Sequence, residues 1–329
     1  MLRKFVKGFL ALIGAFFVFY FGYALFRPLP SYESGEITVE KDFGSFLQKV
    51  YQRNQGLTIR HGNEELLVRN RPGKAKYAIL YVHGFGASRA EGEYAVNRLA
   101  KEFQANVYYL RLPGHGTNIE DHLQHGFQEY LRTAEEALWH MPLLGEKIVV
   151  IGTSMGGLIS TWLAATHKEL VHALVLVSPF YDYADPRAII LKLPGGVKIG
   201  ELIMGKYRIK KKAVKDPKRR EGYENYWYVP QYMAAVEHLE NLRRFAAREE
   251  IYRKISCPVL MLVYYKDPQN KDGSARVDAM RHAFGFFSTP ENKKWLVEIP
   301  DGDHVLLSEY VASDKEKIHK ALVEFMKKI

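Results

Sequence analysis

The pentapeptide Gly152-Thr153-Ser154-Met155-Gly156 decides how this chain folds, because the segments beside it give it a structural context. It follows the apolar run Lys147–Ile151 and precedes the helix-like run Gly157–His167. A strand, a tight turn and a helix form a sharp elbow, in which glycine avoids collisions with the adjoining backbone. The elbow presents the Ser154 hydroxyl above a sheet, at a helix start that favours developing negative charge. The pattern therefore predicts a nucleophilic serine.

Strand-like and helix-like runs alternate on both sides of the elbow. The strand-like runs are Lys76–His83, Asn106–Arg111, Lys147–Ile151, Ala173–Ser178, Val259–Tyr265 and Trp295–Ile299. The main helix-like runs are Arg89–Phe103, Phe127–His140, Gly157–His167, Val277–Phe287 and Lys315–Lys328. This alternation predicts an α/β fold with a mostly parallel central sheet flanked by helices. Nearer the N-terminus, Leu57–His61 and Glu65–Arg69 suggest a hairpin.

The alternation stops after Pro179 and resumes at Pro258. The intervening residues 181–256 are rich in aromatic and charged side chains and show no clear strand. A segment of this length between two core strands is too long for a plain loop, so we expect an inserted helical cap. The expected organisation is an anchor and linker over 1–32, a core over 33–180 and 257–329, and the cap over 181–256.

Composition limits the classes of site. The chain has 329 residues, is 47% hydrophobic and contains one cysteine, Cys257, which excludes an intrachain disulfide and a cysteine-based metal site. Its net charge is +10, and residues 206–220 are strongly basic. In a chain with a membrane segment, anionic lipid headgroups are the simplest partner for such residues, and we expect no nucleic acid. A merely solvated basic face is the alternative.

The N-terminus predicts a membrane anchor. Gly8–Phe26 contains no charged residue and as a helix has about the length of a bilayer core, roughly 28 Å. Arg3, Lys4 and Lys7 precede it, which predicts a cytoplasmic N-terminus and an extracytoplasmic catalytic domain on a single-pass anchor. A cleaved signal peptide, with export of the catalytic domain, is the alternative.

A nucleophilic serine needs a base, and the base needs an orienting acid. His304 follows the last strand-like run on a short loop, from which it can reach back over the sheet to Ser154. Two candidates for the acid, Asp267 and Asp272, follow the run Val259–Tyr265. We favour Asp272, because it directly precedes the next helix, and keep Asp267 as the alternative.

The negative oxygen of an acyl-transfer intermediate needs two backbone N–H donors. We expect one from Met155, directly after the serine, and one from Phe85 in the glycine-rich loop His83-Gly84-Phe85-Gly86. His83 is expected to order that loop.

Together these motifs resemble the α/β-hydrolase superfamily, and most of all its monoacylglycerol lipase, carboxylesterase and serine aminopeptidase S33-like branch. The resemblance covers about residues 77–329 and includes two further motifs, Arg111-Leu112-Pro113-Gly114-His115-Gly116 and Gly302-Asp303-His304. The resemblance implies that His115 is structural. It also implies that the later aspartate of a lengthened acid loop, here Asp272, is the acid that orients the histidine. The family has an apolar pair after that acid, whereas this chain has Gly273-Ser274.

The expected function is serine hydrolysis of carboxylic esters, such as monoacylglycerols or other lipid-like acyl esters, without cofactor or metal. Tyrosines and tryptophan in the cap suit a lipid-like substrate, although they suit an ordinary cap core as well. The rivals are an amidase, peptidase or acyltransferase on the same triad, and a non-catalytic membrane-tethered binding module.

Overall fold

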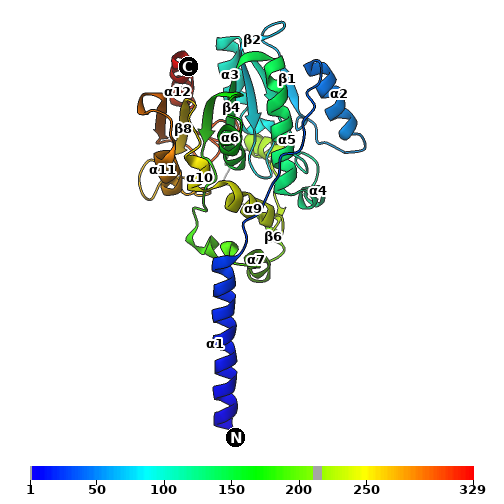
Figure 1. Cartoon of the computed structure of the whole chain (residues 1–329). Coiled ribbons are helices and arrows are strands. Elements are labelled where there is room, and N and C mark those ends of the chain that lie inside the picture. The colour runs from blue at the N-terminus through cyan, green and yellow to red at the C-terminus, as the bar shows by residue number, and fades with distance from the viewer. Residues whose placement is uncertain (1, 210–216) are drawn as a thin grey trace.

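The computed structural model describes residues 2–209 and 217–329 (Figure 1). Its central sheet contains, in spatial order, β1 (Leu66–Val68), β3 (Asn106–Tyr109), β2 (Ala75–Val82), β4 (Gly145–Thr153), β5 (Val171–Val177), β8 (Val259–Tyr264) and β9 (Lys294–Ile299). β1 is antiparallel to β3, and the other neighbouring pairs are parallel. The predicted mostly parallel α/β sheet is confirmed.

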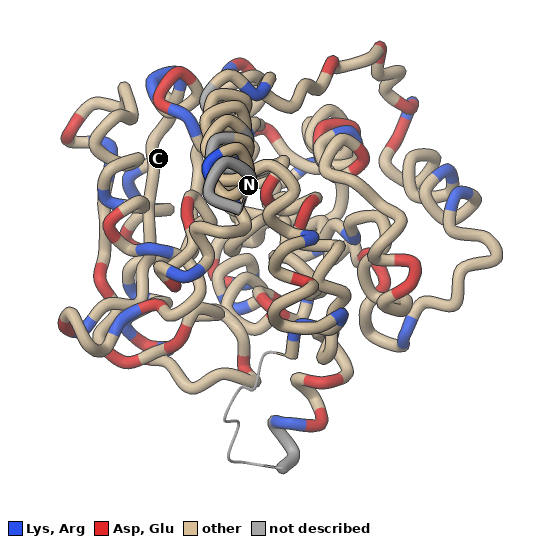
Figure 2. Tube along the Cα trace, turned by 90° about the horizontal axis from the view of Figure 1, so that it is seen from below, with Lys and Arg blue, Asp and Glu red and all other residues tan. Residues whose placement is uncertain are grey.

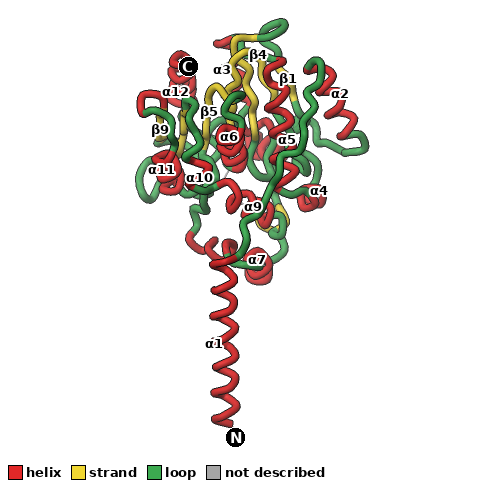
Figure 3. The backbone as a smooth tube through the Cα atoms, viewed as in Figure 1, coloured by secondary structure: helices red, strands yellow, loops and turns green. Residues whose placement is uncertain are grey.

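Helices cover both faces of this sheet, as Figure 3 shows. Successive strand residues face opposite sides, so Ala78 and Leu80 of β2 enter one hydrophobic cluster while Tyr77 and Ile79 enter the other. The first cluster includes residues of α2 (Phe43–Arg53), α5 (Phe127–His140), α6 (Met155–Thr166) and α11 (Val277–Phe286). The second includes residues of α3 (Glu93–Phe103) and α12 (Lys315–Lys328). The short helices η1 (Arg89–Glu91), α4 (Ile119–Gln124), η2 (Met141–Leu143) and η4 (Glu291–Lys293) complete the core segments.

The predicted hairpin near the N-terminus is wrong. β1 pairs with β3, with Leu67 opposite Tyr108, and residues 57–60 form no strand. The Arg60 N–H instead donates to the Gly116 carbonyl oxygen at 2.7 Å. Residues 57–60 therefore lie against the loop after β3 and do not pair with β1.

The cap segment is mainly helical. In chain order its described elements are η3 (Pro186–Lys192), α7 (Gly196–Met204), β6 (Tyr207–Arg208), α8 (Pro217–Tyr226), β7 (Gln231–Tyr232), α9 (Val236–Ala246) and α10 (Glu249–Tyr252). β6 and β7 form an antiparallel pair, with Arg208 opposite Gln231. This pair could not be predicted from the sequence, because two residues are too few for a strand periodicity.

The N-terminal helix α1 (Leu2–Phe26) extends away from the rest of the molecule (Figure 1). This helix includes Arg3, Lys4 and Lys7, which were predicted to precede an apolar span. Where the structure describes the chain, no helix combines the length and apolar character needed to cross a membrane. The predicted single-pass transmembrane anchor is therefore not supported. The extracytoplasmic location of the catalytic domain stays a prediction.

The predicted basic contact segment, residues 206–220, is covered only in part. Residues 210–216 lie outside the described residues. On the face around α1, Lys and Arg are interspersed with Asp and Glu (Figure 2). The described part of the chain therefore gives no support to an extended single-sign surface on that face.

Residues after α1 lie against the core. The Tyr32 hydroxyl donates to Glu135 Oε2 at 2.7 Å, and Arg132 Nη1 donates to the Gly35 carbonyl oxygen at 2.9 Å. The Glu40 N–H donates to His140 Nε2 at 3.0 Å. These bonds hold the segment along α5.

Candidate active site

The elbow between β4 and α6 holds Ser154 in an unusual backbone conformation. Its φ of 55° and ψ of −119° lie in a sparsely populated region, which costs on the order of 1–3 kcal/mol. The Ser154 N–H donates to the Val177 carbonyl oxygen at 3.0 Å, so the neighbouring strand fixes the turn. Gly156 allows the start of α6 to lie close to the end of β2, since a Cβ at this position would lie 2.0 Å from the Val82 carbonyl oxygen. Packing on both sides therefore maintains the strained serine.

Ser154, His304 and Asp272 form one chain of hydrogen bonds. His304 Nε2 lies 2.8 Å from Ser154 Oγ, and His304 Nδ1 lies 2.7 Å from Asp272 Oδ2. Because an ionised carboxylate only accepts, Nδ1 carries the proton and Nε2 faces the serine with a lone pair. All three side chains are buried. The arrangement suits proton transfer from the hydroxyl to the imidazole.

Asp272 is held as an ionised acceptor. Its Oδ1 accepts from the Ser274 N–H at 2.8 Å and from the Ala275 N–H at 3.0 Å. Burial acts to raise the pKa of Asp272, but the adjacent His304 and the hydrogen bonds from His304, Ala275 and Ser274 outweigh it and hold this pKa below its ordinary value. A buried carboxylate with these donors is suited to orienting an imidazole.

The alternative acid, Asp267, lies elsewhere. Its carboxylate is exposed and accepts hydrogen bonds from the N–H groups of Gln269 and Asn270, at 2.9 and 2.8 Å. Asp267 thus closes its own turn and makes no hydrogen bond or ion pair with His304. Asp303 Oδ1 likewise accepts from the backbone N–H of His304, at 2.6 Å.

The two predicted oxyanion donors flank the serine. Met155 begins α6 directly after Ser154, and the loop carrying Phe85 approaches so closely that a Cβ on Gly84 would lie 3.1 Å from the Ser154 Cβ. Neither the Phe85 nor the Met155 N–H donates a hydrogen bond to any described residue. Both donors are therefore open to a substrate oxygen.

The sequence analysis missed Glu91, which supports the same loop. This buried side chain accepts from the Gly84 N–H at 2.5 Å through its Oε2. From the other side, His83 Nδ1 donates to the Gly84 carbonyl oxygen and His83 Nε2 accepts from the Leu112 N–H at 3.1 Å. Burial lowers the pKa of His83 to about 4, which keeps the ring neutral. No motif signals Glu91, because it acts from a short helix outside the loop.

The remaining predicted histidine and cysteine lie outside the hydrogen-bonded chain. His115 is buried and its Nδ1 bonds to the Pro113 carbonyl oxygen at 2.9 Å. Burial raises the pKa of the Cys257 thiol to about 12, which leaves it a poor nucleophile.

The cap closes over the serine. A cavity of about 60 Å³ is lined by Ser154 and His304 from the core and by Tyr223, Trp227, Tyr228 and Arg208 from the cap. The Tyr228 N–H donates to the Gly86 carbonyl oxygen at 2.8 Å, which joins the cap to the oxyanion loop. An adjoining cavity of about 520 Å³ shares Tyr183, Arg208 and Ser274 with this one and is otherwise largely apolar. The site therefore has a small reactive chamber and a larger apolar one.

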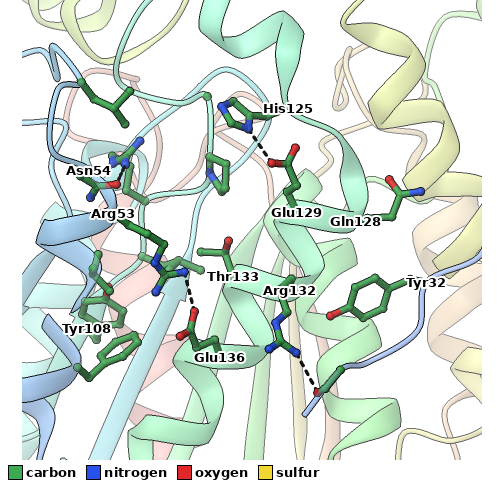
Figure 4. A pocket seen from close by; sticks show the side chains of 18 of the residues that line it. Tyr32, Arg53, Asn54, Tyr108, His125, Gln128, Glu129, Arg132, Thr133 and Glu136 are labelled. Atoms are coloured by element: carbon green, nitrogen blue, oxygen red, sulfur yellow. Dashed lines mark hydrogen bonds and ion pairs between the residues drawn. The ribbon is translucent and has the colours of Figure 1, made fainter. Parts of the chain in front are cut away.

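A third cavity, of about 620 Å³, lies between α2 and α5 and is lined by none of the three hydrogen-bonded residues (Figure 4). Its charged groups pair with one another, as Arg53 does with Glu136 at 2.8 Å and His125 with Glu129 at 3.0 Å. Among the described residues, no group of His, Cys, Asp or Glu is arranged to hold a metal ion. The chemically equipped site is the one around Ser154.

Known proteins with similar sequences include a lipase and a hydrolase-domain protein. A thermostable monoacylglycerol lipase from Bacillus sp. (strain H-257) is 26% identical over 254 residues, which cover 76% of this chain and 90% of that protein. Abhydrolase domain-containing protein abhd-5.2 from Caenorhabditis elegans is 34% identical over 120 residues, 34% of this chain, and the match spans only 26% of that longer protein.

Solved structures show the same fold. The monoacylglycerol lipase of Paleococcus ferrophilus superposes with a TM-score of 0.58 at 18% identity, covering 80% of this chain and 97% of that one. Residues 79–313, well over half of the chain, match the alpha/beta hydrolase family. The chain therefore belongs to the alpha/beta hydrolase family.

Proposed function

We propose that this protein is a serine hydrolase that cleaves carboxylic esters of a lipid-like acyl chain through an acyl-enzyme intermediate. The observation that carries the proposal is the hydrogen-bonded chain from Ser154 Oγ through His304 to Asp272, buried beneath a cap. The lipase and esterase relatives support the reaction class.

In the proposed reaction, His304 Nε2 removes the Ser154 proton as Oγ attacks the ester carbonyl carbon. The oxygen of the tetrahedral intermediate takes up negative charge and accepts from the Phe85 and Met155 N–H groups. His304 then protonates the departing alcohol, and Asp272 stabilises the imidazolium. A water deprotonated by His304 attacks the acyl-enzyme, releases the acid and restores Ser154.

The cavities favour an apolar substrate. The 520 Å³ chamber beside the reactive one is lined by Leu191, Ile203, Met204, Met233 and Val236, among others. Burial of apolar surface contributes about 0.8 kcal/mol per CH₂ group, so a longer chain gains binding energy there. We expect medium or long acyl groups to be preferred over acetyl.

Steady-state kinetics on p-nitrophenyl esters of graded chain length test the proposal. We expect kcat/KM to rise with chain length beyond acetate, and Ser154→Ala to lower it by about 10⁴-fold or more. Ser313→Ala changes a hydroxyl that donates to the Leu306 carbonyl oxygen and serves as the matched control. Equal activity of the wild type and Ser154→Ala would refute the assignment.

A further inference from the structure

The cap places one cation at the junction of the two cavities around Ser154. Arg208 lies on β6 opposite Gln231, and its side chain lines both the reactive chamber and the apolar chamber. Gln231 itself lies against the oxyanion loop, since a Cβ on Gly86 would meet its Nε2. The short β6–β7 pair thus holds Arg208 beside the reacting groups.

Arg208 has no counter-ion among the residues that the structure describes. Its guanidinium makes no hydrogen bond or ion pair with any residue that the structure describes, in contrast to neighbouring cap arginines. Arg243, for example, binds Glu240 through two contacts of 2.7 and 2.8 Å. Glu91 also lines the reactive chamber, but its carboxylate is engaged by the Gly84 N–H. Burial lowers the pKa of Arg208, yet a guanidinium remains charged at neutral pH.

A second donor lies at the same junction. Tyr183 lines both cavities, and its hydroxyl is buried without a hydrogen-bond partner among the described residues. Burial, with the nearby charge of Glu240, raises the pKa of Tyr183 and keeps the hydroxyl protonated. A half-buried cation and a buried hydroxyl that lack partners among the described residues both cost stability, and a bound acceptor would remove that cost.

We propose that Arg208 and Tyr183 bind an anionic oxygen group, a carboxylate or a phosphate, carried by the ester substrate next to its apolar chain. This inference rests on the proposed ester hydrolysis and narrows its substrate class. Arg208 and Tyr183 line the reactive chamber beside Ser154, where the anionic group would lie, while the chain would occupy the adjoining 520 Å³ chamber. The anionic group takes no part in bond making, so water still adds across the ester bond as before.

Two pairs of esters with matched chains test the proposal and separate the two anions. One pair is a 1-monoacylglycerol and the 1-acylglycerol 3-phosphate, and the other is 2-dodecanoyloxyacetamide and 2-dodecanoyloxyacetate, in which the carboxylate lies next to the ester. We expect wild-type kcat/KM to favour the anionic member of at least one pair by about tenfold or more. The pair that shows the preference identifies the anion.

Variants then locate that preference. Arg208→Gln should abolish it, mainly by raising KM for the anionic member, so that the ratio of the two kcat/KM values falls to about one. Arg208→Lys should retain part of it, because the charge remains without the planar donor geometry. Arg253→Gln is the matched control, because Arg253 is an exposed arginine of the cap segment that pairs with Glu249 and lines neither chamber, and it should keep the full preference. Wild type without a preference, or Arg208→Gln lowering both members equally, would overturn the inference.

Labelling of the protein by a fluorophosphonate probe separates this failure from failure of the proposed function. Dodecyl phosphate or dodecanedioate, but not dodecanol, should slow the labelling of wild type and not of Arg208→Gln. Labelling without such protection would refute the anion site alone. No labelling and no ester cleavage would refute the ester hydrolysis itself. Calorimetry of dodecyl phosphate binding to wild type and to Arg208→Gln would then test whether Arg208 binds an anion.

Discussion

The reacting groups of the core and two polar groups of the cap segment differ in whether they have hydrogen-bond partners. In the core, each of Ser154, His304 and Asp272 is bonded to the next, and strand ends fix their positions. In the cap segment, the Arg208 guanidinium and the Tyr183 hydroxyl face the two chambers and have no hydrogen-bond partner among the described residues. The difference suggests two roles. The core supplies a preassembled reaction centre, and the cap segment supplies groups that could bind a substrate.

The largest expected effect concerns the acid in the core. Asp272→Asn should lower kcat by about 10⁴-fold, because an amide cannot hold the His304 tautomer that accepts the serine proton. Asp267→Asn is the matched control, since that exposed carboxylate only closes its own turn, and should remain within about twofold of wild type. Turnover of a p-nitrophenyl ester measures both. The opposite ranking would transfer the role to Asp267.

Glycines give the next comparison. Gly156→Ala should destabilise the protein by about 3 kcal/mol or more, because its Cβ would lie 2.0 Å from the Val82 carbonyl oxygen. Gly195→Ala in the cap has open space and a φ of 67°, so we expect a cost of only about 1 kcal/mol. Urea unfolding measures both values. Similar costs at the two positions would show that the elbow is less tightly packed than described.

A buried histidine under the oxyanion loop predicts pH-dependent stability. Burial lowers the pKa of His122 to about 3, and neither ring nitrogen has a partner among the described residues. The unfolded chain therefore takes up the proton first, so the stabilisation is present above pH 6.5 and is lost as the pH falls toward 3. His122→Phe should reduce the loss of unfolding free energy between pH 7 and pH 5 by about 2 kcal/mol.

Urea unfolding at the two pH values measures this change. His282→Phe, at an exposed position, is the control and should leave the pH dependence of stability unchanged. If His122→Phe retained the full pH dependence, the buried neutral state of His122 would be wrong.

The smallest effect concerns the joint between core and cap. The Tyr228 hydroxyl accepts from the Thr117 N–H at 2.8 Å and donates to the Gly114 carbonyl oxygen at 3.0 Å. Tyr228→Phe should cost about 1–2 kcal/mol, because it leaves buried backbone groups unpaired. Tyr207→Phe, on an exposed ring, should change little. Equal unfolding free energies for Tyr228→Phe and wild type would mean that this joint does not fasten the cap.

The core was predictable from sequence because its strands and helices are long enough to show a hydrophobic pattern and because its motifs consist of neighbouring residues. The strands of the parallel sheet and the elbow at Ser154 follow from apolar runs and glycines at fixed positions. His304 and Asp272 were candidates because each follows a core strand, and strand ends in a parallel sheet share one edge.

The cap and its contacts were beyond that reasoning. The two-residue strands β6 and β7 have no periodicity, and Arg208 is one of many basic residues in its segment. Glu91 supports the Gly84 loop from a helix seven residues away in sequence, a contact that only the folded structure reveals. The false hairpin arose because local alternation does not specify which strand a segment pairs with.

Mass spectrometry of the protein after reaction with a fluorophosphonate probe tests the central claim most directly, because the adduct identifies the nucleophile. Peptide mapping should find a single phosphonylated residue, Ser154, with labelling strongly slowed in Asp272→Asn and unchanged in Asp267→Asn. An adduct on another residue, or intact protein without adduct, would contradict the assignment of Ser154 as the nucleophile.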